Sequence, residues 1–154
     1  MTFDLMSSAF TEGELIPVVH TCDGANQSPP LEWGEPPAGT RSLALILDDP
    51  DAPSGTFTHW VLYGLPARAR GLPQGVSTDE RPSQGGVNGK NTAGRLGYIG
   101  PCPPAGPAHR YIFRLYALDV ELQESPGLSK EQLLRSMEGH VIGEAELTGV
   151  YRRQ

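Results

Sequence analysis

Short apolar segments, separated by stretches rich in glycine and proline, are the feature that most limits how this chain can fold. Residues 42–48, 58–64 and 110–118 are short, apolar and rich in strand-forming side chains. The chain has 19 glycines and 15 prolines in 154 residues. In a disordered chain these would accompany few β-branched and aromatic residues. Because they alternate here with strand-like segments, they indicate turns in a folded, loop-rich β protein.

Other segments predict the remaining elements. Residues 141–152 alternate with a period of two, from Val141 to Tyr151, which predicts a strand with one buried face. Weaker strands are expected near residues 2–6 and 31–33. One helix is expected after Ser129, where Gln132 completes a capping box. Its apolar stripe would be Leu133, Leu134 and Met137, and Gly139 would end it.

Many strands with a single late helix favour a mostly all-β protein, an antiparallel sandwich or barrel, over alternating βαβ units. The length fits one domain, residues 1–154, with a core of ordinary size. The sequence contains no internal repeat and no low-complexity linker.

Charge and hydropathy exclude several classes of partner. The 12 basic and 18 acidic residues give a net charge of -6, which argues against nucleic acid or an anionic membrane as the partner. The N-terminal segment is acidic, unlike a secretory signal, and no apolar run approaches the ~20 residues of a membrane span. We therefore expect a cytoplasmic protein without a transmembrane segment. In a reducing compartment, Cys22 and Cys102 are expected to be free thiols.

Polar residues gather at three places. Residues 48–53 place three aspartates and two prolines directly after a strand segment, and since the carboxylates repel one another some should be paired. His59 enters the next strand beside Trp60, and the strand period places the two side chains on opposite faces. Residues 98–111 combine four prolines with donors that suit a phosphate or carboxylate. Taken singly, the three are typical of a solvated turn, a structural histidine and a structural turn.

Considered together, the three clusters predict a binding site. They bring the side chains of Asp49, His59, His109 and Tyr111 to one rim, where Asp49 would accept from an imidazole N–H or a ligand ammonium. Backbone N–H groups around Gly100 would form a concavity for an anion. Polar groups that converge among prolines and aromatics are the usual composition of a ligand pocket.

Residues 66–97 form a long segment with many glycines and prolines and hardly an apolar pair. Loops of this length are uncommon in compact domains and are usually functional or mobile. We therefore expect the chemistry at this end of the fold rather than on the helix.

Several stretches closely resemble the phosphatidylethanolamine-binding proteins, also called Raf kinase inhibitor proteins, and above all their compact bacterial and archaeal branch. The matching stretches are TCDG (21–24), SPPLEW (28–33), DPDAP (49–53), HW (59–60), GYIGPCPP (97–104), HRY (109–111) and GH (139–140). They occur in family order and cover essentially the whole chain. Phe57 matches an aromatic residue of the animal members, whereas Cys102 stands where those members have glycine.

The resemblance implies a β-sandwich of two antiparallel sheets with a small anion pocket at one end. It implies three parts of the pocket wall: Asp49, Pro50 and His59; His109 and Tyr111; and Tyr98, Gly100, Pro103 and Pro104. Family members bind phosphate-bearing head groups and acetate-like anions, and some inhibit kinases or serine proteases. We therefore expect a non-enzymatic protein that needs no cofactor and binds phosphate, phosphoethanolamine or a carboxylate. A kinase or serine protease partner and a homodimer are further expectations.

Enzymatic alternatives use the same residues. His59, His109 and Asp49 have the ligand types of a 2-His-1-carboxylate iron site. Cys102 could instead act as a nucleophile with His59 or His109 as its base. A third alternative is a regulator that contacts a protein partner through residues 66–97 or through the pocket rim.

Overall fold

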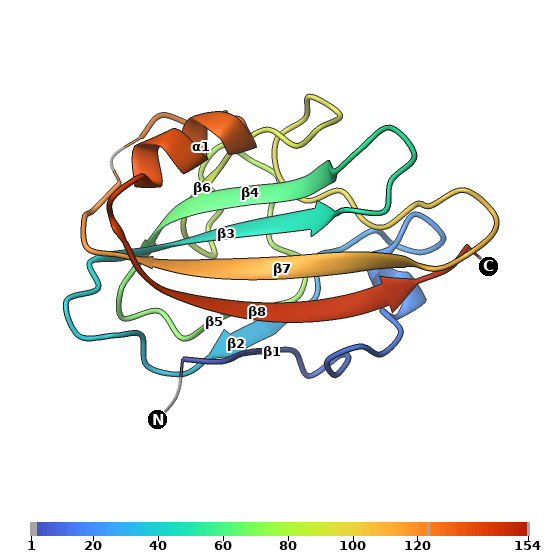
Figure 1. Ribbon diagram of the computed structural model, residues 1–154, viewed down its shortest axis with the longest axis horizontal. Helices are drawn as coiled ribbons and strands as arrows, with labels where there is room; N and C mark the ends of the chain where they lie inside the picture. Colours follow the sequence, from blue (N-terminus) through green and yellow to red (C-terminus); the bar gives the residue numbers. More distant parts are fainter. Residues whose placement is uncertain (1–2, 123, 154) are drawn as a thin grey trace.

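The fold is described by a computed structural model that covers residues 3–122 and 124–153 (Figure 1). Its elements are β1 (Leu5–Met6), the 3-10 helix η1 (Val18–His20), β2 (Leu31–Trp33), β3 (Ser42–Asp49), β4 (Phe57–Pro66), β5 (Gly71–Leu72), β6 (Val87–Asn88), β7 (His109–Leu118), α1 (Lys130–Met137) and β8 (Val141–Tyr151). The expected mostly-β class, with one short helix late in the chain, is confirmed.

The strands form two antiparallel sheets. The larger has the order β6-β4-β3-β7-β8 and the smaller the order β1-β2-β5. One apolar cluster joins the two sheets through side chains such as Leu31 and Trp33 of β2 and Leu45 of β3. A second cluster lies on the other face of the large sheet, which α1 covers with Leu133 and Met137 (Figure 1). The architecture is therefore a sandwich whose outer face carries the helix.

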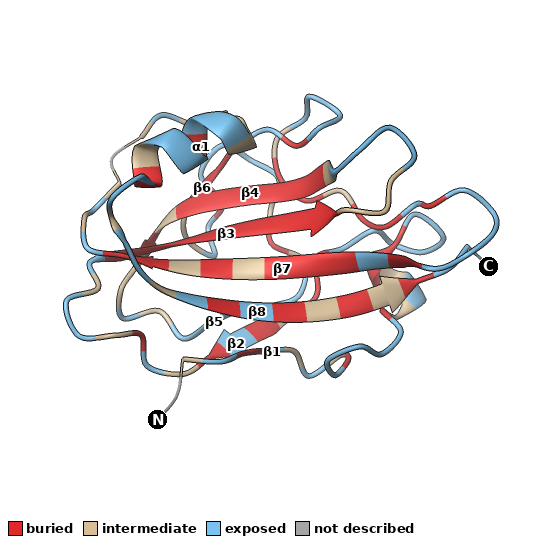
Figure 2. Ribbon diagram, in the orientation of Figure 1, coloured by how far each residue is buried: buried red, intermediate tan, exposed pale blue. Residues whose placement is uncertain are grey.

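Strand β3 lies at the centre of the large sheet, and all eight of its residues are buried (Figure 2). A strand covered on both faces reads as a continuous apolar run, which is the pattern of residues 42–48. Leu45 and Leu47 face the small sheet, whereas Ala44 and Ile46 face the helix. Because β3 is held between two strands and two apolar layers, the side chains at its end have a rigid base.

The helix has the capping box that the sequence predicts. Ser129 Oγ accepts from the Gln132 N–H at 3.2 Å, and the Gln132 side chain accepts from the Ser129 N–H at 2.9 Å. Leu133 and Met137 are buried as expected, but Leu134 is exposed because it lies on the solvent side of the helix.

Strand β8 alternates as predicted along most of its length. Val141 is an exception: it is exposed, next to a register shift between Ala117 and Leu118 of the neighbouring strand β7. From Ala145 onward, the odd-numbered positions are buried as expected.

Residues 66–97 are more ordered than their composition suggests. They supply β5 to the small sheet and β6 to the large one, and Val76 joins the inner core. The buried Asn88 accepts from Trp60 Nε1 at 3.1 Å and donates to the carbonyls of Ser77 and Asp79, both at 2.8 Å. The buried amide of Asn88 thus helps to hold this segment in place.

Candidate functional site

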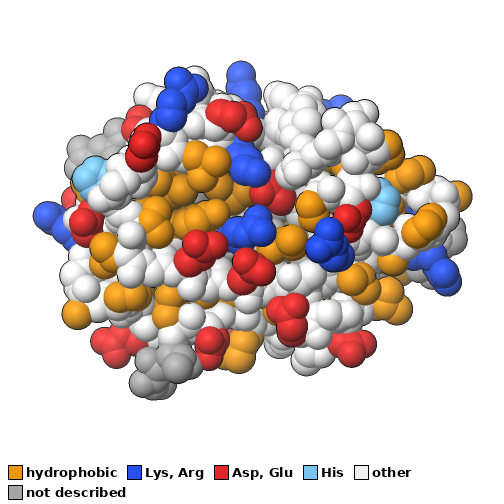
Figure 3. All heavy atoms as spheres, viewed as in Figure 1, with side chains coloured by type: hydrophobic (Ala, Val, Ile, Leu, Met, Phe, Trp, Pro, Cys, Tyr) orange, Lys and Arg blue, Asp and Glu red, His pale blue; other side chains and the backbone are white. Residues whose placement is uncertain are grey.

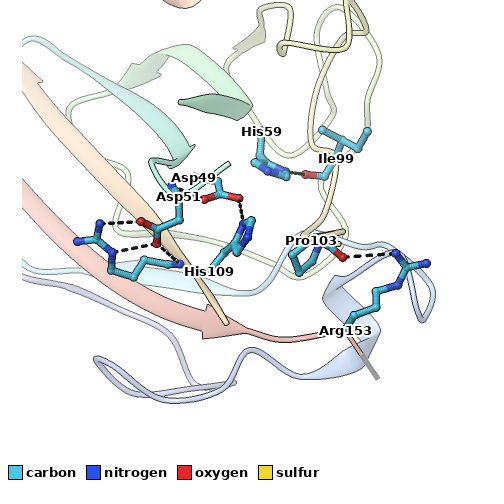
Figure 4. A network of polar contacts seen from close by, with 8 residues as sticks. Asp49, Asp51, His59, Ile99, Pro103, His109 and Arg153 are labelled. Atoms are coloured by element: carbon cyan, nitrogen blue, oxygen red, sulfur yellow. Dashed lines mark hydrogen bonds and ion pairs between the residues drawn. The ribbon is translucent and has the colours of Figure 1, made fainter. Parts of the chain in front are cut away.

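A pocket of about 170 Å³ lies at the ends of β3, β4 and β7, on the face of the large sheet that carries the inner core. Its lining comprises Asp49, Ala52, Pro53, Phe57, His59, Ile99, Gly100, Cys102, Pro103, Pro104, His109 and Tyr111. The structure thus brings together the four side chains expected at one rim. Figure 4 shows His59 and His109 approaching this region from two different strands.

An irregularity in β4 directs His59 into the pocket. Leu47 pairs with Trp60 and Asp48 pairs with Thr58, so His59 is the extra residue of a bulge. The prediction that His59 and Trp60 point to opposite faces is therefore wrong. His59 packs edge-on against Tyr111 with 5.3 Å between ring centroids, and Tyr111 and Trp60 belong to the same inner cluster.

The two aspartates at the end of β3 serve opposite faces of the sheet. Asp49 points to the pocket, where its Oδ2 accepts from His109 Nδ1 at 2.7 Å and its Oδ1 accepts from the Asp51 N–H at 2.8 Å. Asp48 points to the helix side, where it accepts from Thr58 Oγ1 and from Lys130 Nζ, both at 2.7 Å. Each buried carboxylate is paired, as charge repulsion required.

The third aspartate of the turn is paired at the surface. Arg110 donates to Asp51 through Nε at 3.0 Å and through Nη2 at 2.9 Å (Figure 4). These hydrogen bonds lower the pKa of Asp51 to about 2. The pair fixes the turn after β3 to the start of β7, so both flanks of the Asp49–His109 hydrogen bond are held.

The ring of His59 is held in one tautomer. Its Nδ1 donates to the Ile99 carbonyl at 2.7 Å, and only 5% of the residue is exposed. Burial lowers the pKa of His59, and the Ile99 carbonyl and the Asp49 carboxylate oppose that effect. In the neutral ring Nε2 is then the lone-pair nitrogen, which is left for a ligand.

Tyr111 carries a buried hydroxyl oxygen that has no hydrogen-bond partner among the described residues. Burial raises the pKa of Tyr111, and the nearby Asp49 carboxylate raises it further, so the hydroxyl keeps its proton. A buried polar group without a partner is costly and calls for an explanation such as a ligand or an ordered water.

The pocket's other wall is the proline-rich segment after Tyr98. Ile99, Gly100, Cys102, Pro103 and Pro104 line the cavity. The expected anion concavity of backbone N–H groups is wrong at Gly100, because that N–H donates to Asn26 Oδ1 at 2.8 Å. A Cβ at Gly100 would lie 2.3 Å from the His20 carbonyl oxygen, so this position has room only for glycine.

Two residues of the expected site lie outside the cavity lining. The Tyr98 hydroxyl donates to the His20 carbonyl at 2.6 Å, and its ring lines a neighbouring hollow of about 480 Å³ instead. Pro50 lies in the turn after β3.

Residues 66–97 contribute nothing to the lining of the pocket, and the expectation that the chemistry lies at their end of the fold rather than on the helix stays a prediction. The sequence analysis also gave no ligand-binding role to Phe57, Ile99 or Ala52. Phe57 could have been found from its spacing, two positions before His59, and it packs 4.7 Å from that ring.

Cys22 and Cys102 form a disulfide, which corrects the expectation of free thiols. The expectation rested on the compartment, whereas the fold places η1 against the proline-rich wall and brings the two sulfurs together. With its sulfur bonded, Cys102 cannot act as a nucleophile in this state.

Within residues 3–122 and 124–153, His, Cys, Asp and Glu side chains form no group of three or more with the placement needed to hold a metal ion. His59 and His109 both direct Nδ1 to protein acceptors, Ile99 and Asp49.

No helix in the described part of the chain is long and apolar enough to cross a membrane.

Comparisons with known proteins identify relatives of this chain. A family model described as phosphatidylethanolamine-binding protein matches residues 6–152. A UPF0098 protein of Methanothermobacter thermautotrophicus is 54% identical, over 97% of this chain and 99% of the relative. A UPF0098 protein of Aquifex aeolicus is 45% identical, over 97% of this chain and 88% of the relative.

Two crystal structures show the same fold. A Chlamydia trachomatis homologue of phosphatidylethanolamine-binding protein is 42% identical, with a TM-score of 0.91 and coverage of 99% of each chain. Escherichia coli YbcL, described as a member of the mammalian family, is 32% identical, with a TM-score of 0.91 over all of both chains. The likenesses extend over sequence, fold and length, and the chain belongs to the phosphatidylethanolamine-binding protein family.

Proposed function

We propose that the pocket binds a small anionic group of the phosphate, phosphoethanolamine or carboxylate type. Membership in a family of binding proteins supports ligand binding in general. The observation that carries the finer statement is that both pocket histidines have Nδ1 fixed by a protein acceptor. Each ring therefore offers Nε2 to a ligand from a fixed position.

Three side chains face the ligand. An anion favours the proton on His59 Nε2, which then donates to an anionic oxygen, and His109 presents its Nε2 from the neighbouring strand. The Tyr111 hydroxyl, which has no partner among the described residues, offers a further hydrogen bond. Asp49 is already engaged by His109 and by the Asp51 N–H, so it positions His109 rather than contacting the anion. A hydrogen bond to a charged acceptor in such a site is stronger than one between neutral groups.

Size and lining limit the ligand class. A volume of about 170 Å³ is below the range that holds drug-sized molecules, so a head group fits and a whole lipid does not. Phe57, Pro103 and Pro104 give an apolar floor that excludes water and strengthens the polar contacts. A neutral wall with few fixed charges also accommodates a short organic substituent such as ethanolamine.

Calorimetric titration with phosphoethanolamine tests the proposal. His59→Ala should weaken binding about 100-fold or more, because it removes a fixed donor from a buried site. His140→Ala is the matched control: the His140 side chain is 45% exposed, pairs with Asp119, and does not line the pocket. Circular dichroism should show that both variants are folded. Unchanged affinity in folded His59→Ala would remove this pocket as the binding site.

A further inference from the structure

The Cys22–Cys102 disulfide lies in the pocket wall, because Cys102 is one of the lining residues. We propose that it is a redox modification site: reduction by a dithiol loosens residues 102–104 and weakens binding of the anion. The inference rests on the proposed function for its ligand. The effect of reduction on residues 102–104 themselves does not depend on any ligand.

The wall is held in two different ways along its length. Up to Pro101, hydrogen bonds tie it to residues 20–26: from Tyr98 to the His20 carbonyl, from Gly100 to Asn26, and from the Cys22 N–H to the Pro101 carbonyl at 3.1 Å. These contacts do not depend on the sulfurs. This part of the wall should therefore stay in place after reduction.

Beyond Pro101 the hold is weaker. Residues 102–108 belong to no strand or helix, and the three prolines among them have no N–H to donate. The disulfide holds this stretch at Cys102, and Arg153 Nη1 donates to the Pro103 carbonyl at 3.4 Å, a long hydrogen bond (Figure 4). Pro103 and Pro104, which floor the pocket, follow the disulfide directly.

The disulfide is accessible in the folded state. Cys22 and Cys102 are both exposed, and so are residues 104–108. Thiol–disulfide exchange requires a thiolate to reach one sulfur, so a buried bond would resist it. On the face that Figure 3 shows, acidic and basic side chains are interspersed, so neither sign of charge dominates there.

The reaction is a two-step exchange. One thiolate of the dithiol attacks a sulfur of the disulfide and forms a mixed disulfide, and its second thiolate releases the protein. The dithiol is oxidised to its own disulfide, while Cys22 and Cys102 gain two electrons and two protons and become thiols. In the reduced protein the ligand must order residues 102–104 as it binds. We expect affinity to fall about tenfold, the cost of ordering one or two residues.

The test compares oxidised, dithiothreitol-reduced and reoxidised protein. Phosphoethanolamine affinity should fall on reduction and recover on reoxidation. Backbone NMR relaxation should show greater mobility at residues 102, 105, 106 and 108, with β3, β4 and β7 unchanged. The matched control is the double variant Cys22→Ser/Cys102→Ser. Its affinity and relaxation should resemble those of the reduced form and should not change when dithiothreitol is added.

Unchanged relaxation at residues 102–108 would overturn the inference, and so would global unfolding of the reduced chain. If even the oxidised protein does not bind phosphoethanolamine, the proposed function fails by itself. The relaxation data would then still decide whether the disulfide holds the wall: mobility that rises on reduction supports it, and mobility that does not change overturns it.

Discussion

The two walls of the pocket differ in how they are held. Asp49, His59, His109 and Tyr111 stand on strands of one sheet, with β3 between β4 and β7. The facing wall, residues 99–104, is irregular chain tied to η1 and the segment after it by hydrogen bonds and one disulfide. The strand wall gains rigidity from ladder hydrogen bonds and buried apolar area, and the proline wall from a few tethers.

The two walls therefore have different tasks: the strand wall carries the polar groups, and the proline wall closes the cavity. Donors that must be fixed to within a fraction of an ångström lie on the strands, as positioning of a binding group requires. The groups on the other wall are mostly apolar and need only close the cavity. Changes to the strand wall should therefore alter both stability and binding, whereas changes to the proline wall should act mainly on binding and on the unfolded chain.

The largest expected effect concerns the tether of the proline wall. Cys22→Ser/Cys102→Ser should lower the free energy of unfolding by about 4 kcal/mol, because the bond closes a loop with a sequence separation of 80 in the unfolded chain. Urea denaturation of oxidised, reduced and variant protein measures it. A loss below about 1 kcal/mol would show that the disulfide tether contributes little to stability and would contradict this account of the proline wall.

Asp49→Ala should be the next largest effect and tests the strand wall. It leaves the His109 Nδ1–H and the Asp51 N–H without their acceptor at a position that is 3% exposed. We expect a loss of about 3 kcal/mol together with loss of ligand binding. Asp119→Ala, at an exposed pair with His140, is the control and should cost less than about 0.5 kcal/mol.

The pH dependence of binding tests whether His59 contributes to binding through the proton that it takes up. Burial holds the pKa of His59 below its usual value of 6.5, so the free folded protein keeps this ring neutral. An anion favours the protonated ring, and affinity for sulfate should rise as pH falls from 8 toward that lowered pKa, by at most about tenfold per unit. The same shift makes the free protein less stable as pH falls below 6.5, since the unfolded chain takes up the proton first.

His59→Gln provides the control for that titration, because glutamine does not titrate in this range. Its sulfate affinity should change less with pH than that of the unaltered protein. An equally steep profile in the variant would show that His59 is not the group whose protonation strengthens binding.

The smallest effect is expected from Tyr111→Phe. Removing a buried hydroxyl that has no partner in the described part of the chain should leave stability unchanged or raise it by about 1 kcal/mol. Phosphoethanolamine affinity should fall nonetheless, because the anion loses a donor. Thermal unfolding and calorimetry measure the two effects. A clear loss of stability with unchanged affinity would show that the hydroxyl serves the fold rather than the ligand.

The sequence predicted the fold from features that are local. The continuous apolar run of β3 and the capping box of Ser129 and Gln132 each needed only neighbouring residues. The period of β8 failed at Val141, close to a register shift that belongs to strand pairing, and Gly143 is only half-buried. The amides of Asn88 and Asn91 help to hold residues 66–97, and composition does not reveal those contacts.

The candidate site was predictable in its residues but not in its geometry. Six predicted residues besides His59 line the cavity: Asp49, Gly100, Pro103, Pro104, His109 and Tyr111. The bulge that turns His59 inward depends on how β4 pairs with β3, and the disulfide depends on two loops that are distant in sequence. Both are tertiary features that no local pattern encodes. The ligand-binding roles, the cytoplasmic location, and the kinase or serine protease partner stay predictions.

The most direct test of the central claim is an NMR titration of isotope-labelled, oxidised, metal-free protein with phosphoethanolamine. We predict saturable shifts confined to the pocket, at Asp49, His59, Gly100, His109 and Tyr111. Their absence there, with or without saturable shifts elsewhere, would contradict the account: the family's fold would be kept while this pocket served another use.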